Sequence, residues 1–412
     1  MSEFFRKSKR GRGKAKHEIL DRYLKAFFAI QCQSVTWDTP VLYVDGFAGP
    51  GTYKTEDENS NEEIGSPIVA YQAASEHTLI GNFNAKHNKI LLIFVEKNAA
   101  LCRKLEKNLA RLQSTKTEVV REVVQFRVVN DDFKSYLDQL LSSENEEFSH
   151  SPMFVFADPF GYGGESIPMK SFKKLMERQD GKWLPTEVFI TVMDGFARRF
   201  ISDSRQSSSI NALMGYENWH YLTEQDNLTP EQRRTEFIKL YIDNLVQGIP
   251  KALVLKFSMR NNNNRHVYHL IFLTSHIKGI KSMKEAMWKK TQNATEMVFS
   301  EWMENRNASE SIIDKTREQV ARCLSELIKN EFSGLTVRGS KLELYIWLET
   351  PYISNVKNNL KKLFKTYAIN SERAFEKIKY QFPGEPKLLR GTVNRDEDDI
   401  LESILSESLR SS

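Results

Sequence analysis

Two strand-like segments late in this chain follow one another too closely to lie parallel. Residues 252–259 and 266–275 are rich in aliphatic and aromatic side chains, and only residues 260–265 join them. A parallel pair needs a crossover of a dozen or more residues, so these two strands must form an antiparallel hairpin. Any sheet that contains them therefore includes an antiparallel pair.

Strand and helix patterns alternate before this hairpin. Strands are expected at 41–47, 90–96, 122–130, 153–160 and 186–193, and helices at about 17–30, 67–77, 97–111, 131–142 and 168–178. Such alternation is typical of a parallel sheet covered by helices on both faces. Five strands and a closing hairpin predict an α/β fold with the seven-stranded, Rossmann-like sheet of class I methyltransferases. An ordinary dinucleotide-binding fold has no such hairpin.

The 412 residues suffice for two or three domains. We expect a basic arm (1–16), a methyltransferase-like domain (17–295) with a helical insertion (200–245), a second domain (300–392) and an acidic tail (393–412). In the second domain, three helix patterns and a hairpin expected near Pro383–Gly384 predict a winged-helix-like shape, which is common in nucleic-acid-binding proteins. Its lysines, and those of the basic arm, either contact phosphates or are merely solvated.

Several classes of protein are disfavoured. No apolar run approaches the roughly 20 residues that span a bilayer, and no hydrophobic signal segment is visible, so a cytoplasmic protein without a membrane partner is expected. The three cysteines stand far apart, which argues against disulfides and a CxxC metal site. His266 and His269 are three residues apart in an expected strand and should face opposite sides of the sheet. The sequence therefore predicts no metal site.

A glycine-containing turn follows the first strand. Residues 41–51 are Val-Leu-Tyr-Val-Asp-Gly-Phe-Ala-Gly-Pro-Gly. A phosphate-binding P-loop needs lysine where Thr52 stands, and a dinucleotide fingerprint needs glycine where Lys54 stands. S-adenosylmethionine has no pyrophosphate, so a short turn suffices for it, and we predict this cofactor. Its expected contacts here are Asp45, Phe47, Gly49 and Gly51, although an empty strand-to-helix turn would look the same.

Acidic side chains follow the next two strands. Glu96 ends the second strand, where an acid can accept hydrogen bonds from ribose hydroxyls. It could instead stabilise the start of the following helix. After the third strand, Asp131 and Asp132 stand where an acid would meet the adenine amino group, but Asp132 could equally cap the next helix.

The fourth strand ends in Asp158-Pro159-Phe160-Gly161. This segment resembles the Asp-Pro-Pro-aromatic motif of enzymes that methylate exocyclic amines. There the acid accepts a hydrogen bond from the amine and the aromatic ring stacks on a base flipped out of its duplex. Asp158, Pro159 and Phe160 are therefore the predicted catalytic residues. The alternative is a buried turn, and Phe160 in place of the second proline leaves the position of the stacking ring open.

Taken in order, these segments resemble the bacterial three-Cys-motif partner (TcmP) family. The resemblance is carried by Lys16-His17-x-Ile19-Leu20-x-x-Tyr23-Leu24, residues 43–51, Gly65-Ser66-Pro67, residues 94–96, Asp132-Phe133, residues 156–161, residues 268–274 and Met283-Lys284-x-Ala286-Met287-Trp288. It implies a methyltransferase fold, often with a winged-helix-like domain, and a separate partner that carries the three cysteines and resembles radical-SAM proteins. Residues 193–200 depart from the family, and there Arg198 and Arg199 could contact substrate phosphates.

Two functional hypotheses follow. The first is an S-adenosylmethionine-dependent methyltransferase that acts on a nucleic-acid base, at an exocyclic amine. The second is a methyltransferase fold without catalysis that serves as the nucleic-acid-recognising partner of the three-Cys-motif protein. A P-loop-like ATPase is a third option, weakened by the missing lysine.

Overall fold

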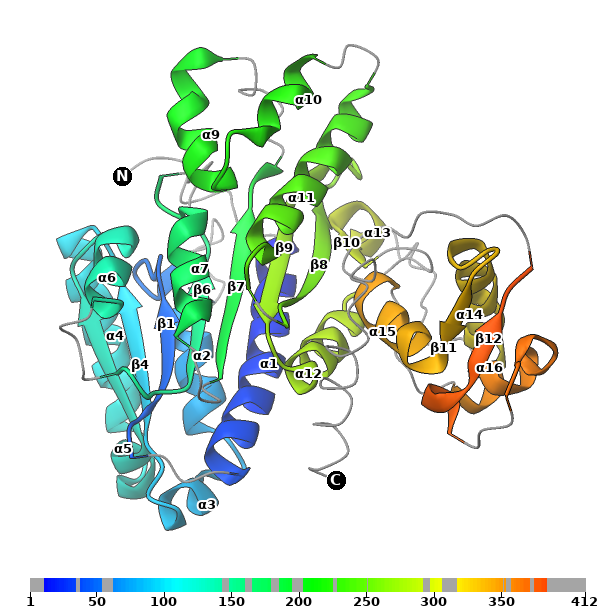
Figure 1. Ribbon diagram of the computed structural model, residues 1–412. Helices are drawn as coiled ribbons and strands as arrows, with labels where there is room; N and C mark the ends of the chain where they lie inside the picture. The colour runs from blue at the N-terminus through cyan, green and yellow to red at the C-terminus, as the bar shows by residue number, and fades with distance from the viewer. Residues whose placement is uncertain are drawn as a thin grey trace.

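A computed structural model describes residues 11–34, 38–53, 62–142, 148–159, 165–178, 185–194, 203–224, 228–249, 251–291, 297–305, 317–350, 352, 357–370 and 374–383. Figure 1 shows a large α/β domain beside a smaller C-terminal domain. None of the described helices is long and apolar enough to cross a membrane.

An eight-stranded sheet forms the centre of the large domain, in the order β10-β8-β9-β7-β6-β1-β4-β5. Its strands are β1 (Val41–Asp45), β4 (Ile90–Val95), β5 (Val124–Val129), β6 (Met153–Ala157), β7 (Thr186–Val192), β8 (Leu253–Arg260), β9 (His266–Thr274) and β10 (Val298–Ser300). The five strands β5, β4, β1, β6 and β7 are parallel, and β9 is antiparallel to both β7 and β8. This connectivity confirms the predicted class I methyltransferase-like sheet, to which β10 adds an unpredicted edge strand.

Helices cover both faces of the sheet because successive side chains on each strand point to opposite sides. Tyr43 of β1 belongs to one apolar cluster, whereas Leu42 and Val44 belong to the other. The first cluster packs α1 (Arg12–Ser34), α2 (Ser66–Ser75), α3 (Ile80–Ala85), α4 (Ala99–Ser114) and α12 (Ile277–Trp288). The second packs α6 (Phe133–Leu140), α7 (Met169–Glu177), α9 (Ser207–Met214) and α11 (Pro230–Val246). A short helix, α5 (Glu118–Val123), leads into β5.

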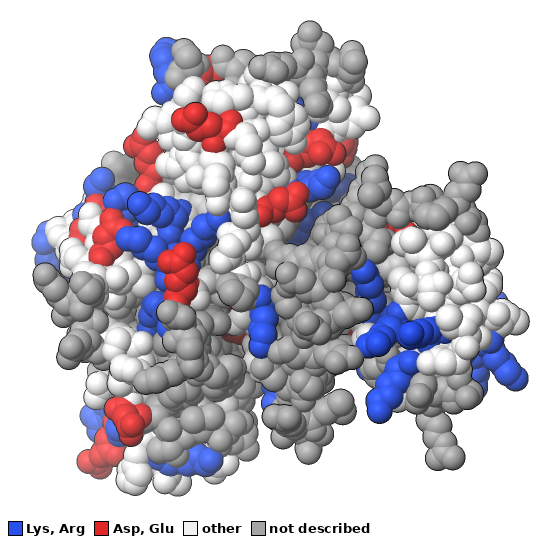
Figure 2. Space-filling model, in the orientation of Figure 1, with Lys and Arg blue, Asp and Glu red and all other residues white. Residues whose placement is uncertain are grey.

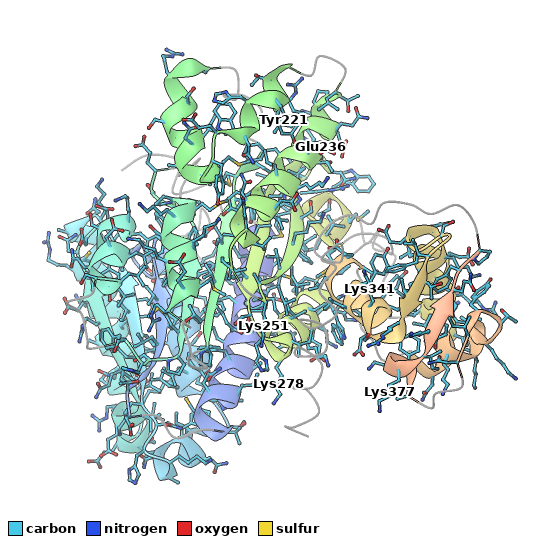
Figure 3. The ribbon with its side chains drawn as sticks, viewed as in Figure 1. Tyr221, Glu236, Lys251, Lys278, Lys341 and Lys377 are labelled. Atoms are coloured by element: carbon cyan, nitrogen blue, oxygen red, sulfur yellow. The ribbon has the colours of Figure 1, made fainter. Side chains whose placement is uncertain are left out.

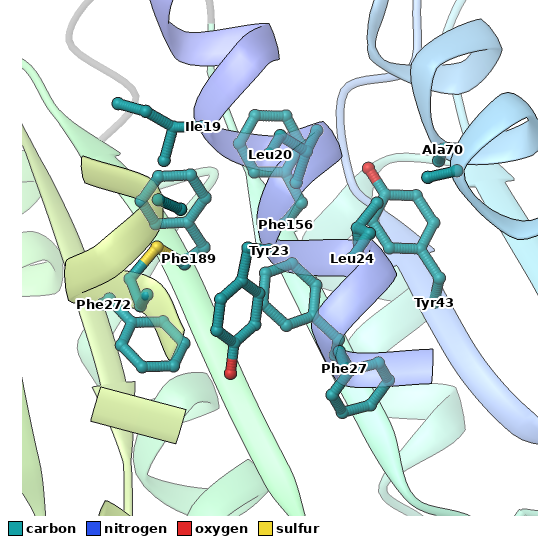
Figure 4. Packing of buried hydrophobic residues seen from close by; sticks show 14 of the residues in the cluster. Ile19, Leu20, Tyr23, Leu24, Phe27, Tyr43, Ala70, Phe156, Phe189 and Phe272 are labelled. Atoms are coloured by element: carbon teal, nitrogen blue, oxygen red, sulfur yellow. The ribbon is translucent and has the colours of Figure 1, made fainter. Parts of the chain in front are cut away.

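The first helix, α1, lies across the middle of the sheet (Figure 4). The Tyr23 ring lies 5.3 Å from that of Phe154 on β6 and 5.0 Å from that of Phe272 on β9. Tyr23 also donates a hydrogen bond to the buried Glu187 of β7, which accepts a second one from Thr274 at 3.1 Å. The helix begins at Arg12 rather than His17, so the end of the predicted basic arm belongs to this helix.

The predicted insertion is helical where the structure describes it. It contains η2 (Ser204–Gln206), α9, η3 (Asn218–His220), α10 (Tyr221–Glu224) and α11. A capping box starts α11: Gln232 N donates to the Thr229 hydroxyl at 3.2 Å, and Thr229 N donates to the Gln232 side chain at 2.8 Å. Tyr221 and Glu236, labelled in Figure 3, lie near each other at the outer end of this insertion.

The C-terminal domain has an apolar core of its own. After α13 (Glu301–Asn305) its elements are α14 (Arg317–Glu331), β11 (Thr336–Arg338), α15 (Gly339–Glu349), α16 (Lys357–Leu363), η5 (Lys365–Tyr367), η6 (Phe375–Lys377) and β12 (Lys379–Gln381). β11 pairs with β12 antiparallel, and Ala368 bridges to Tyr380 on β12. The described partner of β12 is β11, and the hairpin predicted near Pro383–Gly384 extends beyond the last described residue, Pro383. The winged-helix classification therefore stays a prediction.

A buried lysine joins the two domains. Lys284 of α12 donates hydrogen bonds to the carbonyl oxygens of Ile346 and Trp347 in the last turn of α15, the second at 2.9 Å. Burial holds the pKa of this ammonium well below its usual range. Trp347 and Leu348 also complete the apolar cluster of the large domain. The two domains therefore share part of one core.

Candidate functional site

The carboxyl ends of three neighbouring strands bring the predicted site residues together. Asp45 ends β1, Glu96 follows β4 and Asp158 follows β6, and these strands are adjacent in the order β6-β1-β4. In open α/β sheets, ligands bind outside the carboxyl ends of the strands where the strand order reverses. Asp45, Gly49, Gly51, Glu96 and Asp158, together with Lys16, are referred to below as the glycine-turn site.

The turn after β1 accepts only glycine at two positions. Gly49 has φ +61° and Gly51 has φ +77°, which L side chains rarely adopt. A Cβ at Gly49 would lie 2.6 Å from the Tyr53 hydroxyl oxygen, and one at Gly51 would lie 2.8 Å from Leu105. Tyr53 belongs to a small hairpin of β2 (Thr52–Tyr53) and β3 (Glu63–Ile64). The hairpin and α4 therefore pack directly on this turn.

Glu96 holds the glycine turn against the end of β4. Its Oε2 accepts a hydrogen bond from Gly49 N at 3.0 Å, and its Oε1 accepts one from Asn98 N at 2.7 Å. The side chain is half-buried. An ionised carboxylate has about four lone-pair positions, so Glu96 retains capacity for further donors such as hydroxyl groups.

Asp45 is buried beneath the turn. It accepts hydrogen bonds from Phe47 N at 3.2 Å and from the Tyr43 hydroxyl at 3.4 Å. Burial, with a smaller contribution from the nearby Asp158, raises the pKa of Asp45 to about 7, although its hydrogen bonds oppose both effects. A carboxyl group in this position exchanges its proton near neutral pH.

Lys16 pairs with Asp158. The sequence patterns placed Lys16 in the basic arm and in a segment of the family resemblance, but predicted no partner for it. Its ammonium binds Asp158 Oδ2 and lies 5.5 Å from the centre of the Tyr268 ring. Burial lowers the pKa of Lys16, but Asp158, Tyr268 and Asp45 more than offset this, so the pKa is raised. One signal was visible: Lys16 stands four residues before Leu20, on the apolar stripe of α1. A lysine on such a stripe indicates a buried acidic partner.

Two predicted contacts have structural roles. Asp132 caps α6: its Oδ1 accepts from Ser135 N at 3.1 Å and its Oδ2 from the Ser135 hydroxyl at 2.7 Å. Capping is one of its two predicted roles, and a contact with adenine stays a prediction. The Asp131 carboxylate accepts from Asp132 N and from Gln139. The Phe47 ring packs 5.3 Å from that of Phe133.

The remaining predicted residues are only partly visible. Pro159 is buried directly after Asp158. Phe160, Arg198 and Arg199 lie outside the described residues, as do the acidic tail and residues 1–10 of the basic arm. Their predicted roles therefore stay predictions.

The prediction for the two histidines is wrong. Met259 pairs with Tyr268 and Arg260 pairs with His266, so Val267 has no partner in the ladder and forms a bulge. The bulge takes one residue out of the alternation, which places His266 and His269 on the same side of β9. Both rings meet Asp194, which follows β7: His266 Nε2 lies 2.8 Å from Oδ1 and His269 Nδ1 lies 3.1 Å from Oδ2. These three residues are called the histidine cluster below.

Sheet order and glycine-turn geometry together define the class: the large domain has a class I methyltransferase-like fold. No family model matches the chain, and no curated protein matches it. The resemblance to the three-Cys-motif partner family therefore stays a prediction.

The chain is similar to several solved structures at low identity and low TM-score. Trm1 from Pyrococcus horikoshii, solved with S-adenosyl-L-methionine, is 11% identical with a TM-score of 0.34, and the alignment covers 68% of this chain and 59% of that one. Protein LPL1258 from Legionella pneumophila is 12% identical with a TM-score of 0.33, covering 64% and 84%. The plantazolicin methyltransferase BpumL, solved with SAH, is 10% identical with a TM-score of 0.29, covering 64% and 86%. This chain spans less than two thirds of the Trm1 chain, and the fold assignment rests on the strand order.

Proposed function

We propose that this chain is an S-adenosylmethionine-dependent methyltransferase that acts on an exocyclic amine of a nucleic-acid base. One observation carries the proposal. The sheet has the class I order, and at its carboxyl edge a turn that only glycine fits lies beside Asp158 of the next strand.

The glycine-turn site fits this cofactor. The positive φ at Gly49 and Gly51 bends the chain sharply after β1, and Glu96 offers carboxylate oxygens to the ribose hydroxyls of a nucleoside. Asp45 and Phe47 form the floor of the turn. When bound, S-adenosylmethionine supplies an electrophilic methyl group. Asp132 at the end of β5 would lie toward the adenine.

Asp158 is proposed to orient the acceptor. Its Oδ2 binds Lys16, which holds the carboxylate in one orientation and leaves the other oxygen to accept a hydrogen bond from an amine. The buried Pro159 stiffens the turn, and Phe160 would stack on the base. Such residues act by positioning, which can supply several kcal/mol without proton transfer.

Basic side chains support a nucleic-acid acceptor. Figure 2 shows a group of Lys and Arg side chains on this face of the C-terminal domain. The exposed Lys362 of α16, Lys365 of η5 and Lys377 of η6 belong to this domain. Such side chains bind phosphates without regard to base sequence. Arg198 and Arg199 would add further contacts to substrate phosphates.

Calorimetric titration with S-adenosylmethionine tests the cofactor, using the wild type, Gly49→Val and Gly81→Ala. Gly81 lies in α3, where an added Cβ meets nothing within 4 Å, so its variant is the matched control. We expect micromolar binding in the wild type and control, and a loss of at least about 100-fold in Gly49→Val because Val strains a positive φ. Equal affinity in all three proteins would refute the assigned site. ATP is the second ligand, and preference for it would favour the P-loop alternative.

Transfer is tested with a labelled methyl donor and separate pools of DNA and RNA oligonucleotides. Mass spectrometry of the digested nucleosides then identifies the modified base. A methylated exocyclic amine supports the proposal. Binding of the donor without transfer to any pool would refute the enzymatic part and favour the non-catalytic partner.

A further inference from the structure

The histidine cluster has no part in the proposed transfer. Asp194 lies directly after β7, and His266 and His269 come from β9. One ligand atom of each residue lies within 4.8 Å of those of the other two. The side chains of Asp194, His266 and His269 are 0%, 3% and 11% exposed, respectively. Three ligand-type side chains thus converge at one buried point.

We propose that Asp194, His266 and His269 bind one divalent transition-metal ion. Two imidazoles and one carboxylate are the protein ligands of many zinc and non-haem iron sites. Metal–ligand bonds of about 2.1 Å place neighbouring ligand atoms roughly 3.0 to 3.4 Å apart. The nitrogen–oxygen distances of 2.8 and 3.1 Å in the cluster run to the two different carboxylate oxygens of Asp194. One ligand atom of each residue already lies within 4.8 Å of the other two, so binding of one ion would draw the three side chains closer together.

A hydrogen bond behind His266 suits a metal ligand. Its Nδ1 lies 2.9 Å from the Ser258 hydroxyl on β8, on the side of the ring away from Asp194. With the proton on Nδ1 donated to Ser258, Nε2 carries the lone pair toward the cluster. Metal-bound histidines almost always donate their second ring N–H to such a partner, which fixes the tautomer and the ring orientation.

The bulge in β9 makes the arrangement possible. In a regular strand, residues three apart face opposite sides, and His266 would point away from His269. Because Val267 drops out of the ladder, the two ring centres lie 4.2 Å apart on one face. Bulges recur beside functional sites because they re-aim a side chain. The alternation of side chains along β9 is therefore interrupted between the two histidines, which allows both to face Asp194.

An ion can reach the cluster from a neighbouring cavity of about 270 Å³. His266 and His269 line this cavity together with Ser258 and side chains of α11, among them Glu231 and Arg234. With three protein ligands, the remaining coordination positions face this space, as in sites where a metal also binds water or a small molecule. The cavity supplies the entry path that a metal site requires.

The test uses the full chain, freed of metal with a chelator and titrated calorimetrically with Zn²⁺ alone. His269→Gln is compared with His150→Gln, which changes an exposed histidine that is distant in the sequence from the histidine cluster. We expect one Zn²⁺ per chain, with micromolar or tighter affinity, in the wild type and in His150→Gln. His269→Gln should bind at least about 10-fold more weakly, as is typical when a metal site loses a supporting group.

Co²⁺ gives a second measurement on the wild type alone, which decides the matter if the His269 variant does not fold. Visible ligand-field bands that saturate at one equivalent support the proposal. Absence of these bands, or equal Zn²⁺ affinity in folded wild type and His269→Gln, overturns it. No methyl donor is present in either experiment, so the result is independent of the proposed transfer.

Discussion

The parallel and antiparallel halves of the sheet each end in a group of buried or half-buried ionisable side chains, but the two groups are assembled differently. In the parallel half, the glycine turn follows β1 without a gap, and Glu96 and Asp158 each follow the end of a neighbouring strand. In the antiparallel half, the histidine cluster joins the end of β7 to the start of β9, across more than 70 residues, and depends on a bulge.

The difference shows what kind of site a chain displays in its sequence. The carboxyl ends of parallel strands all lie at one edge of the sheet. A polar residue that follows an apolar run in the sequence can therefore be assigned to that edge without knowing which strands are neighbours. Antiparallel strands and bulges place side chains through pairing partners that are distant in the sequence. The first kind of site can be found from local patterns, whereas the second needs the register.

If the two halves are independent, damage to one should leave the other intact. In the metal-free protein, each buried imidazole can donate to one oxygen of the Asp194 carboxylate, whereas an amide offers only one acceptor oxygen. Asp194→Asn should therefore lower the free energy of unfolding of the metal-free protein by about 3 kcal/mol. Urea denaturation in the presence of a chelator measures this. Asp138→Asn, at an exposed pair with Lys134, is the control and should change stability by less than about 0.5 kcal/mol. A large change in the affinity of Asp194→Asn for S-adenosylmethionine would show that the two halves of the sheet are not independent.

The parallel half is probed by Asp158→Ala. Transfer should fall by about 100-fold, since the acceptor loses its orienting carboxylate, while donor affinity stays within about threefold. Single-turnover rates and calorimetry measure the two quantities. Asp158→Asn keeps an acceptor oxygen and should recover part of the rate. Equal losses of binding and transfer would show that Asp158 holds the donor instead.

Lys16→Met sharpens the role of the ion pair. The apolar stem is retained but the charge is lost, so Asp158 is no longer fixed, and we expect about a tenfold lower transfer rate. Lys25→Met on the same helix removes an exposed pair with Asp21 and is the matched control. If both variants kept the wild-type rate, Lys16 would only stabilise the fold.

The smallest predicted effect concerns Glu187, which lies at the amino end of β7. Burial raises the pKa of Glu187 to about 7, although hydrogen bonds from Tyr23 and Thr274 oppose this. The folded state therefore binds this proton more tightly than the unfolded state. The stabilisation is complete below the ordinary pKa of 4.5 and is lost as the pH rises through about 7.

Between pH 5 and 6 the loss attributable to Glu187 is about 1 kcal/mol. Glu187→Gln should remove this part of the pH dependence, which urea denaturation at the two pH values would show. Asp45, whose pKa is also raised to about 7, keeps its own contribution in the variant. An unchanged slope in Glu187→Gln would mean that the carboxylate stays ionised when buried.

Most of the large domain was predictable because its signals are local. Apolar runs gave all seven predicted strands, and the short connection at 260–265 gave the antiparallel pair. The short helices α3 and α5 were missed because neither carries an apolar stripe long enough to be recognised. The edge strand β10 has only three residues and is held by its pairing with β8.

The site was predictable in part, for the same reason. The placement of Gly49, Gly51, Glu96 and Asp158 after strand ends was predictable from position alone, whereas their roles stay predictions. The pairing of Lys16 with Asp158 spans 142 residues, and the pattern of α1 suggested burial without naming a partner. The histidines were misplaced because alternation along a strand holds only where the ladder is regular.

The lysine that joins the domains has a consequence for how the molecule comes apart. Pulling α15 away from α12 would expose the carbonyl groups of Ile346 and Trp347 together with the apolar surface of Trp347 and Leu348. Separation of the two helices would therefore lose hydrophobic burial. For this reason we expect the C-terminal domain to stay fixed against the large domain rather than to move independently. Heating should show a single calorimetric transition for the whole chain. A fragment of residues 17–295 would lack Trp347 and Leu348, so its apolar core would be incomplete and partly exposed to water.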